Sequence, residues 1–292
     1  MSDQREQLAD MLPSWVLALR AAHKSPATVD QYEISIRVFL RWCDETGTPT
    51  VLDRRTVTAF LASLPSSGTA YVRQVALKQF SRWLVSEGEL DADQLTGLTL
   101  PKVTPSPANP LTDDELAALF KACHGNTFRD RRDEAMARVL AETGLRASEL
   151  LGLGVDDVDL TRGIALIRRG KGGRGRTVPF GPKTAHSIDR YLRARRTHKA
   201  PQMWLSEAGK PLAYAGANRA LRKRAADAGI TRFHLHLLRH TFASRWLAAE
   251  GTEGGLMAVA GWRRREMLDR YVAATASDRA AAEAKRLGLG EL

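Results

Sequence analysis

The segment that decides the fold reads HLHLLRHTFASRW over residues 234–246 and AGWRRREMLDRY over residues 260–271. Its first part holds His236, Arg239 and His240 at three- and four-residue steps, which share one face of a helix. We therefore expect these side chains to project together as a cationic, hydrogen-bonding cluster suited to a phosphate. Tyr271 lies downstream, on a segment able to fold back over the cluster, and its phenol is a candidate nucleophile.

The charge of the chain indicates a polyanionic partner. Lys and Arg number 44 against 33 Asp and Glu among 292 residues, a formal net charge of +11. Residues 1–100 hold 10 of the basic and 12 of the acidic residues, so the excess belongs to residues 101–292, with 34 against 21. We expect the partner to bind mainly to this second part.

The cysteines and the N-terminal sequence argue against a disulfide-rich, zinc-binding, secreted or membrane-spanning protein. Cys43 and Cys123 lie far apart and form no CxxC pair, so neither a disulfide framework nor a zinc site is expected. The N-terminus has no signal-peptide pattern, and no apolar run approaches the roughly 20 residues of a membrane span. These features predict a soluble, cytoplasmic protein that does not bind membranes.

The first hundred residues predict a small bundle of four helices. Apolar residues recur at helical steps over residues 8–22, 26–46 and 69–87, and a short helix follows Asp53. Pro13 is expected to interrupt the first helix, and Ser25 to cap the second. Four prolines between residues 100 and 112 then predict an extended linker over residues 101–110. Residues 1–100 and 111–292 are thus the two predicted domains.

The second domain is predicted to be mainly α with a small antiparallel β-sheet. A capping box at Thr112 opens a helix to about Cys123, and a helix from Asp130 ends at Gly144. GIALIRRGKGGRGRTVPF at residues 163–180 alternates and turns at its glycines, as a β-hairpin does. Further helices are expected over residues 182–198, 214–228, 236–249 and, rich in alanine, 277–287.

Arginines and one lysine suit phosphate chemistry. Arg146 follows Gly144, and Glu149 is placed to hold its guanidinium. Arg146 and Arg239 would then provide two guanidinium groups to bind the non-bridging oxygens of a phosphodiester. Lys171, in the hairpin turn, could enter a DNA groove and donate a proton to a leaving alkoxide.

Each of these assignments has an alternative. A lone Arg is commonly a surface ion pair. The GKGG sequence at Lys171 resembles a nucleotide-binding loop, but it lacks the Ser or Thr after Lys and the upstream glycine. His234, His236 and His240 suggest a metal site, but no Glu stands between the last two as in a zinc protease, and we predict no metal. Tyr271 could simply be a core aromatic residue.

Taken in order, four motifs resemble those of the tyrosine recombinase (phage integrase) family, either Xer-like or a compact phage integrase. They are TGLRASEL at residues 143–150, GKGGRGRTVP at 170–179, HLLRHTFAS at 236–244 and AGWRRREMLDRY at 260–271. The helical first domain is similar to the core-binding domain of this family. The resemblance implies a C-shaped clamp round DNA, built from a helical domain and an α+β catalytic domain.

The resemblance also implies a role for each matching residue. Tyr271 attacks the scissile phosphate, forms a 3′-phosphotyrosyl bond and releases a 5′-hydroxyl. Arg146, Arg239 and His236 bind the phosphate, with His236 also a candidate for proton transfer, and Lys171 protonates the leaving 5′ oxygen. No cofactor is implied, because the phosphotyrosine linkage conserves the energy of the phosphodiester.

Three other residues are expected to support this set. Trp262 stands where the family usually has His; an indole is neither acid nor base, so it would hydrogen-bond through its N–H or pack. Glu149 and His240 are expected to orient catalytic groups. The predicted DNA contacts are Arg174, Arg176, Arg219, Arg222 and Lys223.

The implied partner is double-stranded DNA with short inverted-repeat core sites. The resemblance implies a dimer on each site and a tetramer in synapsis, a C-terminal tail helix that packs into a neighbouring protomer, and a place at the nucleoid in the cytoplasm. The chain begins almost directly at the core-binding domain, which favours a simple recombinase. Two other functions share the scaffold: a type IB topoisomerase-like enzyme and an inactive DNA-binding regulator.

Overall fold

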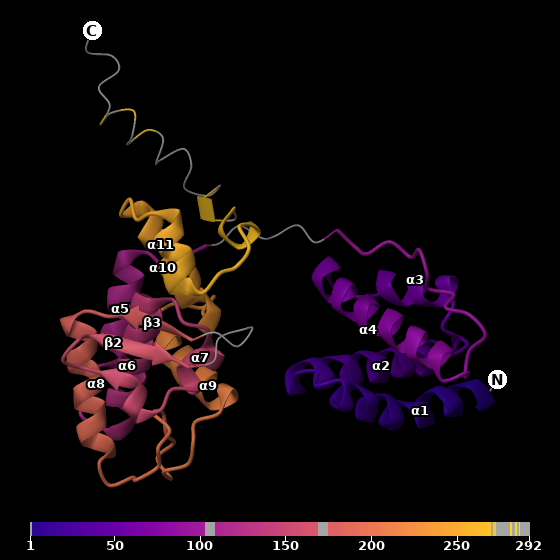
Figure 1. The fold of residues 1–292 in the computed structure, drawn as a ribbon, viewed down its shortest axis with the longest axis horizontal. Helices are drawn as coiled ribbons and strands as arrows, with labels where there is room; N and C mark the ends of the chain where they lie inside the picture. Colours follow the sequence, from indigo (N-terminus) through magenta and orange to yellow (C-terminus); the bar gives the residue numbers. More distant parts are fainter. Residues whose placement is uncertain are drawn as a thin grey trace. The chain divides into compact units, whose positions relative to one another are not determined.

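The computed structural model describes residues 2–102, 109–168, 175–269, 271, 272, 281, 284 and 286, with residues 2–7 described by their backbone alone. Lys171, Arg174, the middle of the proline-rich linker and most of the tail helix expected over residues 277–287 lie outside this set. The chain divides into two compact units, Met1–Pro105 and Ser106–Leu292 (Figure 1). The predicted class, mainly α with a small antiparallel sheet, is confirmed. No helix among the described residues is long and apolar enough to cross a membrane.

The first unit is a bundle of four helices around an aromatic core. They are α1 (Ser2–Ala21), α2 (Pro26–Thr46), α3 (Arg54–Ala62) and α4 (Ser67–Ser86). The side chain of Ser25 caps α2 as predicted, and that of Asp53 caps α3; each accepts a backbone N–H hydrogen bond from the third residue further on. Phe39, Phe60 and Phe80 are fully buried between the helices. Their burial stabilises a unit whose helices are joined by short turns.

The predicted interruption of the first helix at Pro13 is wrong. α1 runs through this residue. A proline inside a helix removes one backbone hydrogen bond and costs about 3 kcal/mol. Here Leu12 and Trp15, each 2% exposed, bury the same face of α1 on both sides of the proline. Burying two such side chains stabilises the helix by roughly 3–6 kcal/mol, which is enough to offset that cost.

The second unit surrounds α6 with helices and a three-stranded antiparallel sheet. Its elements are α5 (Asp113–Cys123), α6 (Phe128–Thr143), α7 (Ala147–Leu151), the 3-10 turn η1 (Val155–Asp157), β1 (Val158–Asp159), β2 (Ile164–Ile167), β3 (Arg176–Pro179), α8 (Pro182–Arg195), α9 (Tyr214–Asp227), α10 (Leu235–Ala248) and α11 (Glu253–Ala260). Residues 266–269, 271 and 272 are also helical. The strands lie in the order β1-β2-β3, with Ile167 opposite Arg176. α6 packs against α5, α8 and α10.

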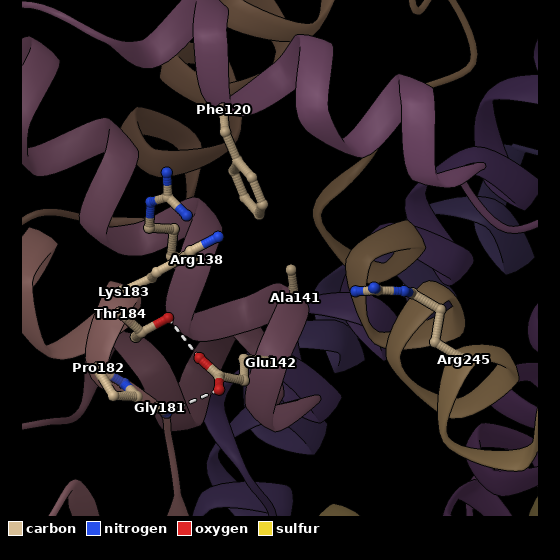
Figure 2. A pocket seen from close by; sticks show the side chains of 9 residues that line it. All are labelled: Phe120, Arg138, Ala141, Glu142, Gly181, Pro182, Lys183, Thr184 and Arg245. Atoms are coloured by element: carbon tan, nitrogen blue, oxygen red, sulfur yellow. Dashed lines mark hydrogen bonds between the residues drawn. The ribbon is translucent and has the colours of Figure 1, made fainter. Parts of the chain in front are cut away.

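The last turn of α6 is fixed by a carboxylate that holds the start of α8. Glu142 accepts hydrogen bonds from the backbone N–H of Gly181 (2.7 Å) and the hydroxyl of Thr184 (2.5 Å) (Figure 2). A cavity of about 480 Å³ lies beside this contact, with Phe120, Arg138 and Arg245 among the residues that line it. Both oxygens of Glu142 are engaged, so the end of α6 is held in place where the chain leaves it for Arg146.

Gly144 makes the turn that connects α6 to Arg146. Its φ of +60° is left-handed, and a Cβ at this position would lie 2.2 Å from Cδ1 of Phe242. Phe242 is 6% exposed and lies on α10, the helix that also carries Arg239. The glycine therefore allows α6 and α10 to approach at the point where the chain turns.

We expect Gly144→Ala to lower the free energy of unfolding by about 2–5 kcal/mol. A left-handed backbone costs a non-glycine residue about 1–2 kcal/mol. Displacing the Phe242 ring adds about 1–3 kcal/mol, as overpacking of a core does. Urea unfolding followed by circular dichroism measures the loss.

Gly229→Ala is the matched control. Its φ is +78°, but an added Cβ would have no atom within 4 Å, so only the backbone part of the loss should remain. Equal losses in the two variants would contradict a close approach of α6 and α10 at Gly144.

Candidate active site

Helix α10 carries the His-x-x-Arg-His sequence, but its side chains do not all point the same way. Arg239 is 2% exposed, and it donates hydrogen bonds from Nη1 to the carbonyl oxygen of Gly144 (2.5 Å) and from Nη2 to that of Ala260 (2.8 Å). His236 is exposed, and its ring meets that of the half-buried His240 edge to face, with centroids 4.8 Å apart. The predicted single cluster thus divides into a buried guanidinium and a pair of imidazoles nearer the surface.

Arg146 stands at the start of α7, directly after the turn at Gly144. Its backbone N–H and its Nη1 each donate to a different oxygen of Glu149, both at 2.9 Å. Its Nη2 lies 3.4 Å from the carbonyl oxygen of Gly261. The side chain of Arg146 remains 26% exposed, whereas that of Glu149 is 4% exposed. The ion pair expected from the sequence is present, and the guanidinium still reaches solvent.

Arg176, predicted to contact DNA, makes its contacts inside the unit. Its side chain is only 14% exposed, and its Nη1 and Nη2 each donate to an oxygen of Glu149 at 2.9 Å. Its Nε donates to the carbonyl oxygen of Val259 (2.8 Å). The guanidinium is thus engaged inside the unit by a carboxylate and a helix end, and a DNA contact by Arg176 stays a prediction.

The C-terminal end of α11 brings the three arginines together. Three consecutive carbonyl oxygens there each accept a hydrogen bond from a different arginine: Val259 from Arg176, Ala260 from Arg239 and Gly261 from Arg146. The C-terminus of a helix carries partial negative charge and unpaired carbonyl oxygens, so it attracts cations. Gly261, at a φ of +66°, ends the helix, and Trp262 follows at once.

The charges of this group are unbalanced. The guanidinium groups of Arg146 and Arg176 pair with the carboxylate of Glu149, whereas that of Arg239 is held by carbonyl oxygens. These three arginines and one glutamate together carry two formal positive charges. Burial lowers the pKa of Arg239 to about 10, helped by the charge of Arg146. Burial would raise the pKa of Glu149, but the hydrogen bonds from Arg176 and the Arg146 backbone, with both positive charges, lower it to about 2. The surplus of positive charge suits the binding of an anion.

Tyr271 is buried against the same group. It is 3% exposed, and its phenol oxygen lies 2.5 Å from Nδ1 of His240. Its ring stacks on Trp262, with centroids 5.2 Å apart and planes inclined by 15°. The ring of Trp262 in turn lies 5.2 Å from Cζ of Arg239. The buried indole N–H of Trp262 has no hydrogen-bond partner among the described residues. Of the two supporting contacts predicted for Trp262, the structure contains the packing.

The basic residues of α9 take no part in these contacts. Arg219 and Arg222 are exposed and line a hollow of about 440 Å³, and Lys223 pairs with Asp227 at 3.0 Å on the same helix. Their exposure leaves them available to a polyanion. Lys171 and Arg174 cannot be placed, because both lie outside the described residues.

The sequence analysis did not predict the buried contacts of Arg176 or the contact between Tyr271 and His240. The burial of Arg176 could have been predicted: Arg176 and Val178 lie two residues apart on β3 and share a face of the strand, and Val178 is an obvious core residue. The contact between Tyr271 and His240 could not have been predicted, because His236 and His240 are one helical turn apart. Which of them meets Tyr271 depends on how the segment after α11 packs against α10.

Comparisons with known proteins agree on one family. Residues 109–278 match the phage integrase family, and residues 11–88 match the phage integrase N-terminal SAM-like domain. The tyrosine recombinase XerC 2 of Ralstonia nicotianae is 31% identical over 84% of this chain and 76% of its own.

Solved structures agree on the fold. The XerH site-specific recombinase bound to palindromic difH substrate, in a post-cleavage complex, has a TM-score of 0.73 at 18% identity, covering 96% of this chain and 84% of the other. A lambda integrase tetramer bound to a Holliday junction has a TM-score of 0.69 at 16% identity, covering 90% and 76%.

The low pKa of Glu149 predicts a pH-dependent contribution to stability. A carboxyl whose pKa falls from 4.5 to about 2 on folding stabilises the protein above pH 4.5, and this stabilisation is lost as the pH falls toward 2. Its size is about 3 kcal/mol at neutral pH. Glu149→Gln should therefore be destabilised relative to wild type at pH 6 and much less so at pH 3. Urea unfolding at the two pH values measures this, and a difference that stays constant would contradict it.

Proposed function

Because the chain belongs to the phage integrase family, we propose that it is a site-specific DNA recombinase that cuts and rejoins DNA through a covalent 3′-phosphotyrosine intermediate. One observation carries this proposal. Arg146, Arg239 and Tyr271 come from three separate segments, yet each contacts the short stretch from Ala260 to Trp262. A tyrosine beside two arginines with surplus positive charge suits attack on a phosphodiester.

The reaction exchanges one phosphate ester for another. The phenol oxygen of Tyr271 forms a bond to phosphorus, the bond from phosphorus to the 5′ oxygen breaks, and the 3′ end stays attached to the protein. The phenol proton passes to His240, whose Nδ1 is within hydrogen-bond reach. Lys171 supplies a proton to the leaving 5′ oxygen. Attack by a 5′-hydroxyl of another strand reverses these steps, so no external energy source is consumed.

The other residues act on the phosphate. Arg146 and Arg239 hold its non-bridging oxygens, where charge grows as phosphorus becomes five-coordinate. His236, exposed beside His240, contacts the phosphate from the solvent side. The unpaired indole N–H of Trp262 is a further donor for the same oxygens. Tyr271 is 3% exposed, so the segment that carries it must open before a phosphate reaches the phenol.

The proposed partner is duplex DNA with short inverted core sites, bound by a dimer at each site and a tetramer in synapsis. The XerH and lambda integrase structures were solved on DNA, the latter as a tetramer, which supports this choice. Arg219, Arg222 and Lys223 of α9 are proposed to contact phosphates of the duplex, and the helical first unit is proposed to bind the same DNA. A topoisomerase-like enzyme is not favoured, because the relatives are named recombinases. An inactive regulator is not favoured, because the chain has the full set of Arg146, Lys171, His236, Arg239 and Tyr271.

We expect Tyr271→Phe to bind DNA and to form no covalent complex, because only the attacking oxygen is removed. The probe is a pool of nicked duplexes of random sequence, in which a short fragment diffuses away after cleavage and traps the intermediate. Denaturing gel electrophoresis measures the trapped protein. Tyr214→Phe, at a 56% exposed tyrosine on α9, is the control and should trap DNA like wild type. Trapping by Tyr271→Phe would reject the assigned nucleophile.

We expect His240→Phe to slow formation of the covalent complex by about 100-fold, as loss of a general base does. Phenylalanine keeps an aromatic ring against Tyr271 and His236 but offers no acceptor to the phenol. The single-turnover rate on the trapped substrate, measured at saturating DNA, separates this loss from weaker binding. A wild-type rate would show that the proton leaves by another route.

A further inference from the structure

Arg176 lies at the first position of β3, opposite Ile167 across the β2–β3 pair. Three N–H donors of its guanidinium are engaged at 2.8–2.9 Å, two by Glu149 and one by Val259. A planar guanidinium bridges a carboxylate in this paired way, which an ammonium cannot do. The side chain therefore ties the β-sheet both to α7, through Glu149, and to the end of α11.

The guanidinium also occupies the space that a side chain at Gly261 would need. A Cβ at this glycine would be 2.8 Å from Cζ and Nη1 of Arg176 and 3.1 Å from its Nε. The next residue is Trp262, which stacks on Tyr271. The position of Arg176 thus fits the turn from which the Trp262 and Tyr271 segment departs.

Glu149 is shared between Arg176 and Arg146, and this sharing sets the charge that a phosphate meets. Arg176 takes both carboxylate oxygens, whereas the side chain of Arg146 takes one. Without Arg176, a carboxylate that is 4% exposed would have Arg146 as its only guanidinium partner among the described residues. Arg146 would then be drawn to Glu149, and the net charge of the group would fall from two positive charges to one.

We propose that Arg176 is a positioning residue of the phosphate site: it neutralises Glu149 and so keeps the guanidinium of Arg146 available to the scissile phosphate. It acts through Glu149 and does not contact DNA. The inference rests on the proposed function, since it names what prepares Arg146 for that reaction.

The test is a pair of substitutions read by their effect on binding and on cleavage. Arg176→Gln should slow single-turnover cleavage of the trapped substrate by about 10–100-fold. This is less than the about 100–1,000-fold loss on removing a direct transition-state donor, because Arg146 is displaced and not removed. The dissociation constant for DNA, measured by fluorescence anisotropy, should change by less than about threefold, because binding is spread over many phosphate contacts. Arg193→Gln, at a 59% exposed arginine paired with Asp189 on α8, is the matched control and should leave both quantities unchanged.

The double variant Glu149→Gln/Arg176→Gln separates positioning from mere structural support. It restores the two positive charges of the wild-type group, so it should cleave DNA at least about tenfold faster than Arg176→Gln alone. In the Glu149→Gln background, adding Arg176→Gln should change the cleavage rate by less than about threefold. This second comparison holds even if Arg176→Gln alone fails to fold.

Two results would overturn the inference. A proportional loss of binding and cleavage in Arg176→Gln would make Arg176 a direct DNA contact. A double variant no faster than Arg176→Gln, or well below Glu149→Gln alone, would mean that Arg176 does not act through Glu149. Failure of the proposed function looks different, because wild-type protein would then trap no DNA at all.

Discussion

The catalytic unit depends on the end of one short helix. At the C-terminus of α11, three consecutive carbonyl groups each accept a hydrogen bond from a different arginine, brought in by α7, β3 and α10. Helix ends leave such oxygens unpaired, and guanidinium groups are the donors that can satisfy them while keeping N–H groups for other partners. The residue after this end is Trp262, and Tyr271 stacks on it. One helix terminus thus fixes the arginines and starts the segment that carries the nucleophile.

The balance of charge explains why this arrangement suits a phosphate. Three arginines and one glutamate leave two positive charges in a place where Arg239 is almost fully buried. Burial lowers the pKa of Arg239 to about 10, still well above neutral pH, so the charge is retained. An entering phosphodiester would partly neutralise the group, and the extra charge that develops in the transition state would neutralise it further. The same surplus holds the pKa of Glu149 near 2 and keeps this carboxyl ionised.

Local signals in the sequence were enough for most of the fold, because they act over a few residues. Ser25, Thr112 and Gly144 mark helix ends through hydrogen bonds or backbone angles that need no tertiary partner. The prediction that Pro13 interrupts the first helix failed, because the burial of α1 in the bundle outweighs the cost of the proline. Burial depends on residues far apart in the sequence. At the site, the spacing of the motifs identified the residues but not their contacts. Arg176 was predicted to bind DNA: Val178 marks the buried face of β3 that Arg176 shares, but it does not identify Glu149 and Val259 as the partners of the guanidinium.

Mass spectrometry of the trapped complex can show whether the oxygen of Tyr271 becomes bonded to DNA. Trypsin should release residues 271–279 as one peptide, since arginines precede and end this stretch. After nuclease digestion, we expect a 3′-linked nucleotide on Tyr271 of this peptide. A nucleotide on any other residue, or one linked through its 5′ phosphate, would contradict it.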